Sequence, residues 1–96
     1  MPRRYPPLTP EEVIAILLSR GFHLDRTAGS HAQYSGTVRG QFRRVTVDLH
    51  YRDLDDRAIK RLILQSGFTR EEFYGSTKES ARKISLRADE YPIPLK

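Results

Sequence analysis

The chain has 96 residues, with 17 lysines and arginines, 12 acidic residues and no cysteine. A chain of this length forms a single domain, and without cysteine it can build neither disulfides nor thiolate metal sites. No apolar run approaches the roughly 18 to 20 residues of a membrane span, and residues 1–7 lack the hydrophobic segment of a secretory signal, so we expect a cytoplasmic protein without membrane attachment.

The first predicted element is a helix, which follows a proline-rich lead at residues 1–8 where we expect no packing. Thr9 can cap the helix, Pro10 suits its first position, and Glu12 completes a capping box. Gly21 supplies the left-handed residue that ends it. The apolar residues in between follow the helical period: Val13, Ile14, Leu17 and Leu18.

Three alternating stretches then predict an antiparallel sheet. We expect strands at residues 22–26, 30–35 and 43–49, with a turn at 27–29 and a hairpin loop at 36–40 that contains two glycines. If Ser35 lies opposite Arg43 or Arg44, the antiparallel register brings His31 opposite Val47 or Asp48.

Strand parity places all three histidines of the chain on one side of this sheet. Successive side chains of a strand point to opposite faces, so His31, Gln33 and Ser35 lie opposite the apolar Ala32 and Tyr34. The same rule separates the polar residues of the other two strands from the apolar ones: His23 and Asp25, then Arg44, Thr46, Asp48 and His50. We therefore predict that His23, His31, Asp48 and His50 share the face that the helices leave open.

The second long helix is predicted to begin after Asp55 and to end at Gly67. A capping box of Thr69 and Glu72 predicts a short helix through Tyr74, and residues 76–79 predict the start of another through about residue 84. We expect the tail at residues 91–94 to be extended, and we favour a frayed end over an arm that binds a partner. The fold class is therefore α+β, with the order α-β-β-β-α and both long helices on one face of a three-stranded antiparallel sheet.

The chemistry open to these residues is that of histidine without a metal or a cofactor. An imidazole with its usual pKa near 6.5 can take a proton from a ribose 2′-hydroxyl, and the RNA then supplies the attacking oxygen. Such cleavage needs only a positioned base and cations near the phosphate. His31 beside the turn of Gly29 and Ser30 is the candidate base, although an exposed histidine without any role is the ordinary alternative.

The net charge of +5 favours a polyanionic partner, and a solvated basic surface explains it equally well. We predict RNA contacts from Arg44, which parity places with the histidines, and from its neighbours Arg43 and Gln33. Two other functions remain open on these residues. The chain could be a module that binds RNA without cutting it, or an interaction protein whose basic surface serves an acidic partner.

The Gly29-Ser30-His31 triplet before the second strand, His50 after a valine-rich strand, and a helix that ends in residues 65–69 resemble the HicA family. That family comprises small toxin ribonucleases of bacterial and archaeal toxin–antitoxin pairs, with a fold like that of double-stranded-RNA-binding domains. The resemblance covers residues 8–74 and leaves residues 75–96 as a C-terminal extension.

The resemblance implies an mRNA interferase in which His31 is catalytic and Gly29 and Ser30 form its turn. His50 and Asp48 are possible supporting residues. A HicB-type antitoxin would neutralise the enzyme in a hetero-oligomer, and a homo-oligomer is also open. The chain has Asp48 where the family often has proline, and this carboxylate could either orient an imidazole or repel a phosphate. Arg57 and Ala58 stand where small residues are usual.

Overall fold

Helix α1 (Pro10–Ser19) begins with the predicted capping box, in which the Thr9 hydroxyl accepts from the Glu12 N–H and the Glu12 carboxylate accepts from the Thr9 N–H. The computed structural model describes residues 3–96, so Met1 and Pro2 of the predicted lead lie outside the described residues. The order α-β-β-β-α is confirmed, and two short helices follow it. The remaining elements are β1 (His23–Ala28), β2 (His31–Val38), β3 (Gln41–Asp48), α2 (Asp56–Ser66), α3 (Arg70–Tyr74) and α4 (Lys78–Arg82).

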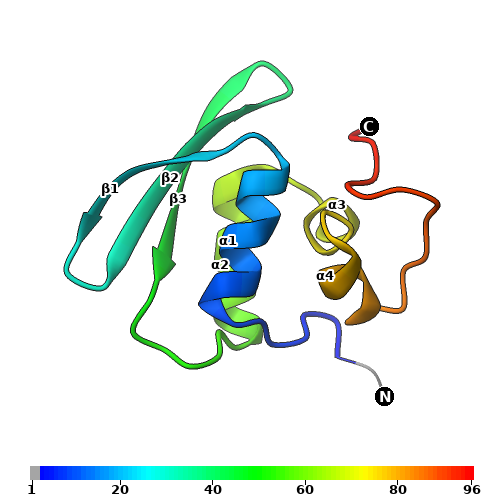
Figure 1. Ribbon diagram of the computed structural model, residues 1–96, viewed down its shortest axis with the longest axis horizontal. Helices are drawn as coiled ribbons and strands as arrows, with labels where there is room; N and C mark the ends of the chain where they lie inside the picture. The colour runs from blue at the N-terminus through cyan, green and yellow to red at the C-terminus, as the bar shows by residue number, and fades with distance from the viewer. Residues whose placement is uncertain (1–2) are drawn as a thin grey trace.

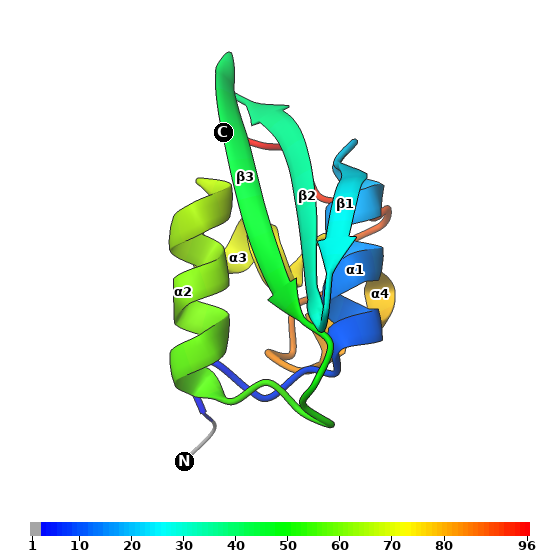
Figure 2. The ribbon, with the colours of Figure 1, turned by 90° about the vertical axis from the view of Figure 1, so that its left-hand side faces the viewer.

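The strands form one antiparallel sheet in the order β1-β2-β3, and α1 and α2 pack on one of its faces (Figure 1). Figure 2 shows the other face of the sheet, which no helix covers. The core lies between the sheet and the helices, where apolar side chains of both layers are buried: Val13, Ile16, Leu17, Tyr34, Val45, Val47, Ile59 and Leu62. The helices α3 and α4 stack on the far side of α1 and α2. Within residues 3–96 no helix is long and apolar enough to cross a membrane.

Both hairpins turn in two residues, so the predicted strand limits were wrong by one to three residues. Thr27 and Ala28 belong to β1, and Gly29 with φ +59° and Ser30 make the first turn. The second turn is Arg39-Gly40, in which both residues have positive φ as in a type I′ turn. The third strand ends at Asp48, which leaves Leu49 and His50 in the following turn.

Gly36 belongs to β2 and not to a loop, which corrects the prediction for residues 36–40. A Cβ at this position would lie 2.7 Å from Cδ1 of Phe22, so the glycine makes room for a buried aromatic ring. The ring of Phe22 in turn lies 5.9 Å from that of Phe68. Phe22 is therefore buried, whereas Leu24 on the outer strand β1 is half exposed.

The two edges of the sheet are irregular. In β1 the pairing with β2 shifts between Leu24 and Arg26, which makes a bulge at Asp25. At the other edge the side chain of Gln65 in α2 reaches β3, and its Oε1 accepts a 3.1 Å hydrogen bond from the Thr46 N–H. Neither edge therefore presents an uninterrupted row of backbone groups.

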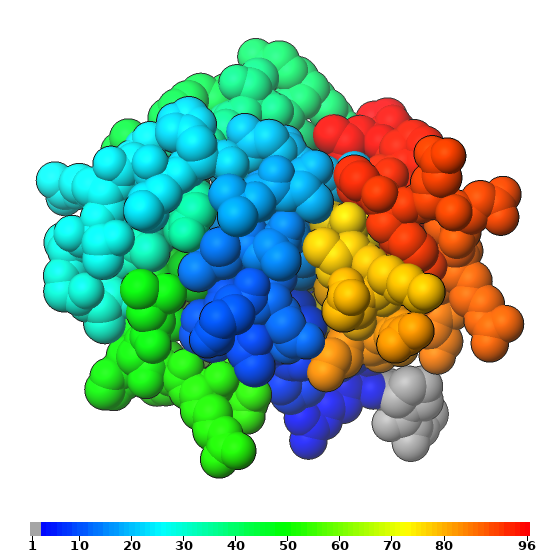
Figure 3. Space-filling model, in the orientation of Figure 1, coloured from blue at the N-terminus to red at the C-terminus, as the bar shows by residue number. Residues whose placement is uncertain are grey.

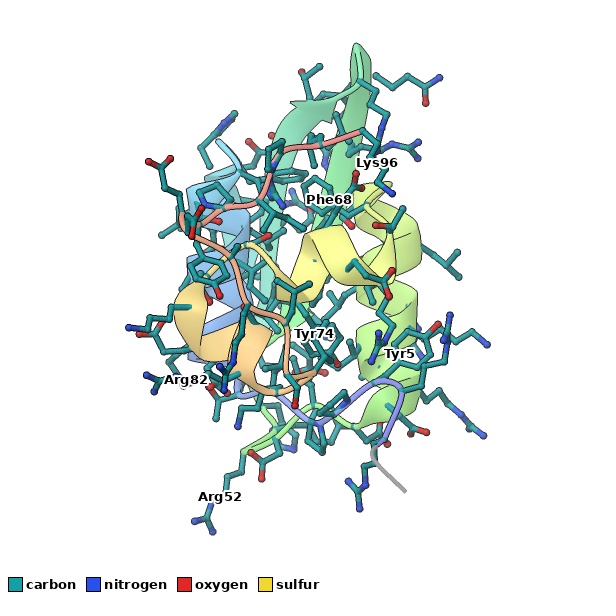
Figure 4. The ribbon with its side chains drawn as sticks, turned by 90° about the vertical axis from the view of Figure 1, so that its right-hand side faces the viewer. Tyr5, Arg52, Phe68, Tyr74, Arg82 and Lys96 are labelled. Atoms are coloured by element: carbon teal, nitrogen blue, oxygen red, sulfur yellow. The ribbon has the colours of Figure 1, made fainter. Side chains whose placement is uncertain are left out.

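The lead and the tail both pack, contrary to our expectation. Leu8 is buried and pairs with Leu54 through two backbone hydrogen bonds, while the Tyr74 hydroxyl donates to the Pro6 carbonyl at 2.7 Å. The C-terminal residues lie against α3 and the end of α1 (Figure 3 and Figure 4), and the Ile93 N–H donates to the Gly75 carbonyl. The extension at residues 75–96 thus continues the same body.

Glu72 joins the hairpin tip, α3 and the tail. Its side chain is only 3% exposed, and its Oε2 accepts from the Arg39 guanidinium at the tip of the β2–β3 hairpin and from the Lys96 N–H. Its Oε1 accepts from the Thr69 N–H. Burial raises the pKa of this carboxyl, but the hydrogen bonds from Arg39 and the two N–H groups outweigh burial and hold the pKa at about 2.

Candidate functional site

His31 opens β2 on the face of the sheet that no helix covers. The turn of Gly29 and Ser30 connects β1 to β2, so His31 is the first residue of β2. In the antiparallel pairing of β2 with β3, His31 lies directly opposite Asp48. The His31 Nε2 lies 3.7 Å from the Asp48 Oδ2, with the side chains 58% and 30% exposed. Of the two predicted partners of His31, Val47 and Asp48, the structure therefore selects Asp48, and the imidazole is accessible to a large substrate.

Asp48 is held in place by the turn that follows β3. Its Oδ1 accepts a 3.0 Å hydrogen bond from the His50 N–H, which leaves Oδ2 as the oxygen nearer to His31. The ring of His50 lies edge-on to that of Tyr51, with 5.3 Å between the ring centroids. His50 was predicted on the open face of β3, but it lies just beyond the end of the strand because the chain turns after Asp48.

A second polar cluster lies on the same face, four residues further along β2. The Ser35 hydroxyl donates to the Asp25 Oδ1 at 2.9 Å and lies 3.2 Å from the His23 Nε2. His23 and Asp25 are 3.1 Å apart, and the Arg44 Nη2 lies 3.6 Å from the Asp25 Oδ2. The face prediction for His23, His31 and Asp48 is thus confirmed, and Arg44 lies on this face as parity required.

Arg43 does not share the face of Arg44. It lies opposite Gly36 on the side of the helices, where its guanidinium packs against the end of α2, so that a Cβ at Gly67 would come within 2.7 Å of the Arg43 Nε. Its Nη2 donates to the Gln41 Oε1 at 3.0 Å. Gln33 lies on the open face between the two polar clusters, opposite Thr46.

The sequence interpretation gave no role to Asp25 and Ser35. Asp25 neutralises part of the charge of Arg44, so it bears directly on any phosphate contact of that arginine. Ser35 was predicted opposite Arg43 or Arg44 and lies opposite Arg44, and the pairing of β1 with β2 brings His23 opposite Ser35 as well. The signal was therefore present in the strand pattern.

The arrangement supports proton transfer at an exposed surface. The His31 imidazole, which can exchange a proton, lies 3.7 Å from the Asp48 carboxylate and is open to solvent. Of the two Asp48 oxygens, Oδ1 accepts from the backbone N–H of His50, and Oδ2 faces the His31 ring. Within residues 3–96 no three histidine, aspartate or glutamate side chains are grouped so that they could hold a metal ion.

Comparison with known proteins assigns the family. Searches of curated proteins and of solved structures gave no match to this chain. A family model described as the HicA toxin of bacterial toxin–antitoxin systems matches residues 10–68, which is more than half of the chain and spans the sheet and both long helices. The chain therefore belongs to the HicA toxin family.

Proposed function

We propose that this protein is a toxin ribonuclease that cuts RNA with His31 as the general base. The observation that carries the proposal is the accessible His31 on the open sheet face, set against Asp48, in a member of a toxin family. The imidazole takes the proton of a ribose 2′-hydroxyl, and the freed oxygen attacks the adjacent phosphorus. The bond from phosphorus to the 5′-oxygen breaks, and the 5′-oxygen takes a proton from water. The products are a 2′,3′-cyclic phosphate and a 5′-hydroxyl end.

The other residues of the face support this chemistry in different ways. In the proposed mechanism Asp48 orients the His31 ring and stabilises the imidazolium, and it does not act by repelling the phosphate. Arg44 is more than half exposed and lies on the same face, so it can approach a phosphate, and Gln33 lies between it and His31. His50 is the second candidate for proton transfer. Arg43 has no part in this face.

The partner of this toxin is proposed to be a HicB-type antitoxin, because the family acts in toxin–antitoxin pairs. Expression of the toxin alone should arrest growth. Co-expression of the antitoxin, or the substitution His31→Ala, should restore it. Growth arrest that persists with His31→Ala would locate the toxicity elsewhere on the protein.

The test of the mechanism is cleavage of a labelled RNA in the presence of EDTA. The parent should cut without added metal, and His31→Ala should cut about 10²- to 10⁴-fold more slowly while its RNA affinity hardly changes. His23→Ala is the matched control, because His23 lies on the same face at the far polar cluster and should cut at the parental rate. RNA that is bound but left intact by the parent would make this protein a binding module, and cutting that requires metal would refute the imidazole mechanism.

A further inference from the structure

A cavity of about 220 Å³ lies where the chain passes from the end of β3 into α2. Three of its wall residues come from the loop and three from the first turns of α2, and Asp55, the N-cap of α2, joins them. They are Tyr51, Asp53, Leu54, Asp55, Arg57, Ala58 and Arg61. We propose that this cavity, which we call the loop cavity, binds one unpaired base of the RNA next to the bond that His31 cuts.

A continuous chain of contacts connects the loop cavity with His31. Asp48 lies 3.7 Å from the His31 ring and accepts from the His50 N–H, and the His50 ring packs edge-on against Tyr51, which lines the cavity. A strand of RNA with its phosphate at His31 therefore has the cavity beside it on the same end of the sheet. The inference rests on the proposed function, because it names the part of the substrate that lies beside the cut.

The side chains that line the loop cavity suit an unpaired base. Tyr51 offers an aromatic ring that is 56% exposed, and Leu54 and Ala58 offer apolar walls, which together suit a flat ring that stacks. Arg57 and Arg61 supply positive charge for the phosphates on either side of the base. The volume is below the roughly 300 to 1,000 Å³ of a cleft for a drug-sized ligand, which suits a single base.

The carboxylate of Asp53, which lines the loop cavity, can distinguish one base from another. A carboxylate accepts hydrogen bonds and cannot donate them when ionised, so it favours a base edge that carries an amino group. Cytosine, adenine and guanine carry such a group, and uracil does not. We therefore expect the protein to prefer an amino-bearing base beside the cut, and Asp53→Asn to weaken that preference.

The test separates base binding from cutting by measuring affinity in the non-cutting His31→Ala protein. Short unpaired oligonucleotides of each base should bind it with base-dependent affinity, and adding Tyr51→Ala should weaken the preferred one roughly 5- to 150-fold. Tyr51→Phe should keep the affinity, since it keeps the ring. Leu18→Ala is the matched control, because Leu18 is also 56% exposed but lies on α1 and should leave the affinity unchanged.

The outcomes distinguish this inference from the proposed function. Suppose that the parent cuts no RNA but its affinity for RNA still depends on the base and on Tyr51. The loop cavity is then a base site, and the nuclease mechanism is refuted. If the parent cuts RNA and Tyr51→Ala keeps both the parental affinity and the parental pattern of cut sites, the loop cavity is not a base site. Weakened antitoxin binding with unchanged RNA binding would assign Tyr51 to the protein partner and would also overturn the inference.

Discussion

Replacing the buried Glu72 with glutamine should destabilise the protein and make its stability less dependent on acid pH. The pKa of this carboxyl falls from its ordinary value of 4.5 to about 2 in the folded protein. At about 1.36 kcal/mol for each pKa unit, this fall corresponds to roughly 3 kcal/mol of stability. Arg39 is 37% exposed, so solvent screens part of that interaction, and we expect a loss of about 2 to 3 kcal/mol at neutral pH.

The sign of the pH dependence follows from the direction of the pKa change. A carboxyl whose pKa is lower in the folded state stabilises the protein above its unfolded pKa, and this stabilisation is lost as the pH falls from 4.5 toward 2. Urea unfolding of the parent and of Glu72→Gln at a series of pH values measures both effects. The difference between the two proteins should be largest near neutral pH and should shrink in acid. Curves that stay parallel from pH 6 to pH 3 would refute the reasoning.

Three further results are expected. Affinity for single-stranded RNA should fall as salt rises, with a logarithmic slope of about −0.7 per phosphate neutralised. Arg44→Ala should make this slope shallower by about 0.7, because one phosphate contact is lost. A filter-binding titration that shows no salt effect would refute the inference of a polyanionic partner. Gly36→Ala should lower the urea midpoint by the equivalent of about 1 to 3 kcal/mol without a change in m, because its Cβ meets the Phe22 ring at 2.7 Å. Arg20→Ala removes hydrogen bonds to the Ser76 hydroxyl, the Glu72 carbonyl and the Ile93 carbonyl. The Ile93 amide should therefore exchange its hydrogen with solvent faster than in the parent. An unchanged exchange rate would show that other contacts hold the tail.

The parts of the fold that depend on local pattern were predictable from the sequence. The capping boxes at Thr9 and Thr69 use residues three apart, and the structure forms both. Alternation of apolar and polar residues fixed the faces of β2 and β3, since a shift by one residue would bury the polar set. The hairpin register narrowed the partner of His31 to Val47 or Asp48, and the structure selects Asp48.

The parts that depend on contacts between distant residues were not predictable. Glycine is common in turns, and only the position of the Phe22 ring explains why Gly36 lies inside a strand. The tail docks because Arg20 and Glu72 hold it from α1 and α3, and no local pattern in residues 91–96 reports those partners. The catalytic role of His31 stays a prediction until RNA cleavage is measured.

The irregular edges of the sheet restrict how other chains can approach this protein. An edge strand with free backbone groups invites a further strand, which leads to uncontrolled assembly. Here the bulge at Asp25 disrupts the pairing pattern along β1, and the Gln65 amide occupies a donor of β3. Growth of the sheet into its neighbours is disfavoured on both sides. Other chains that approach the sheet therefore meet side chains at its edges instead of an unbroken row of bare backbone groups.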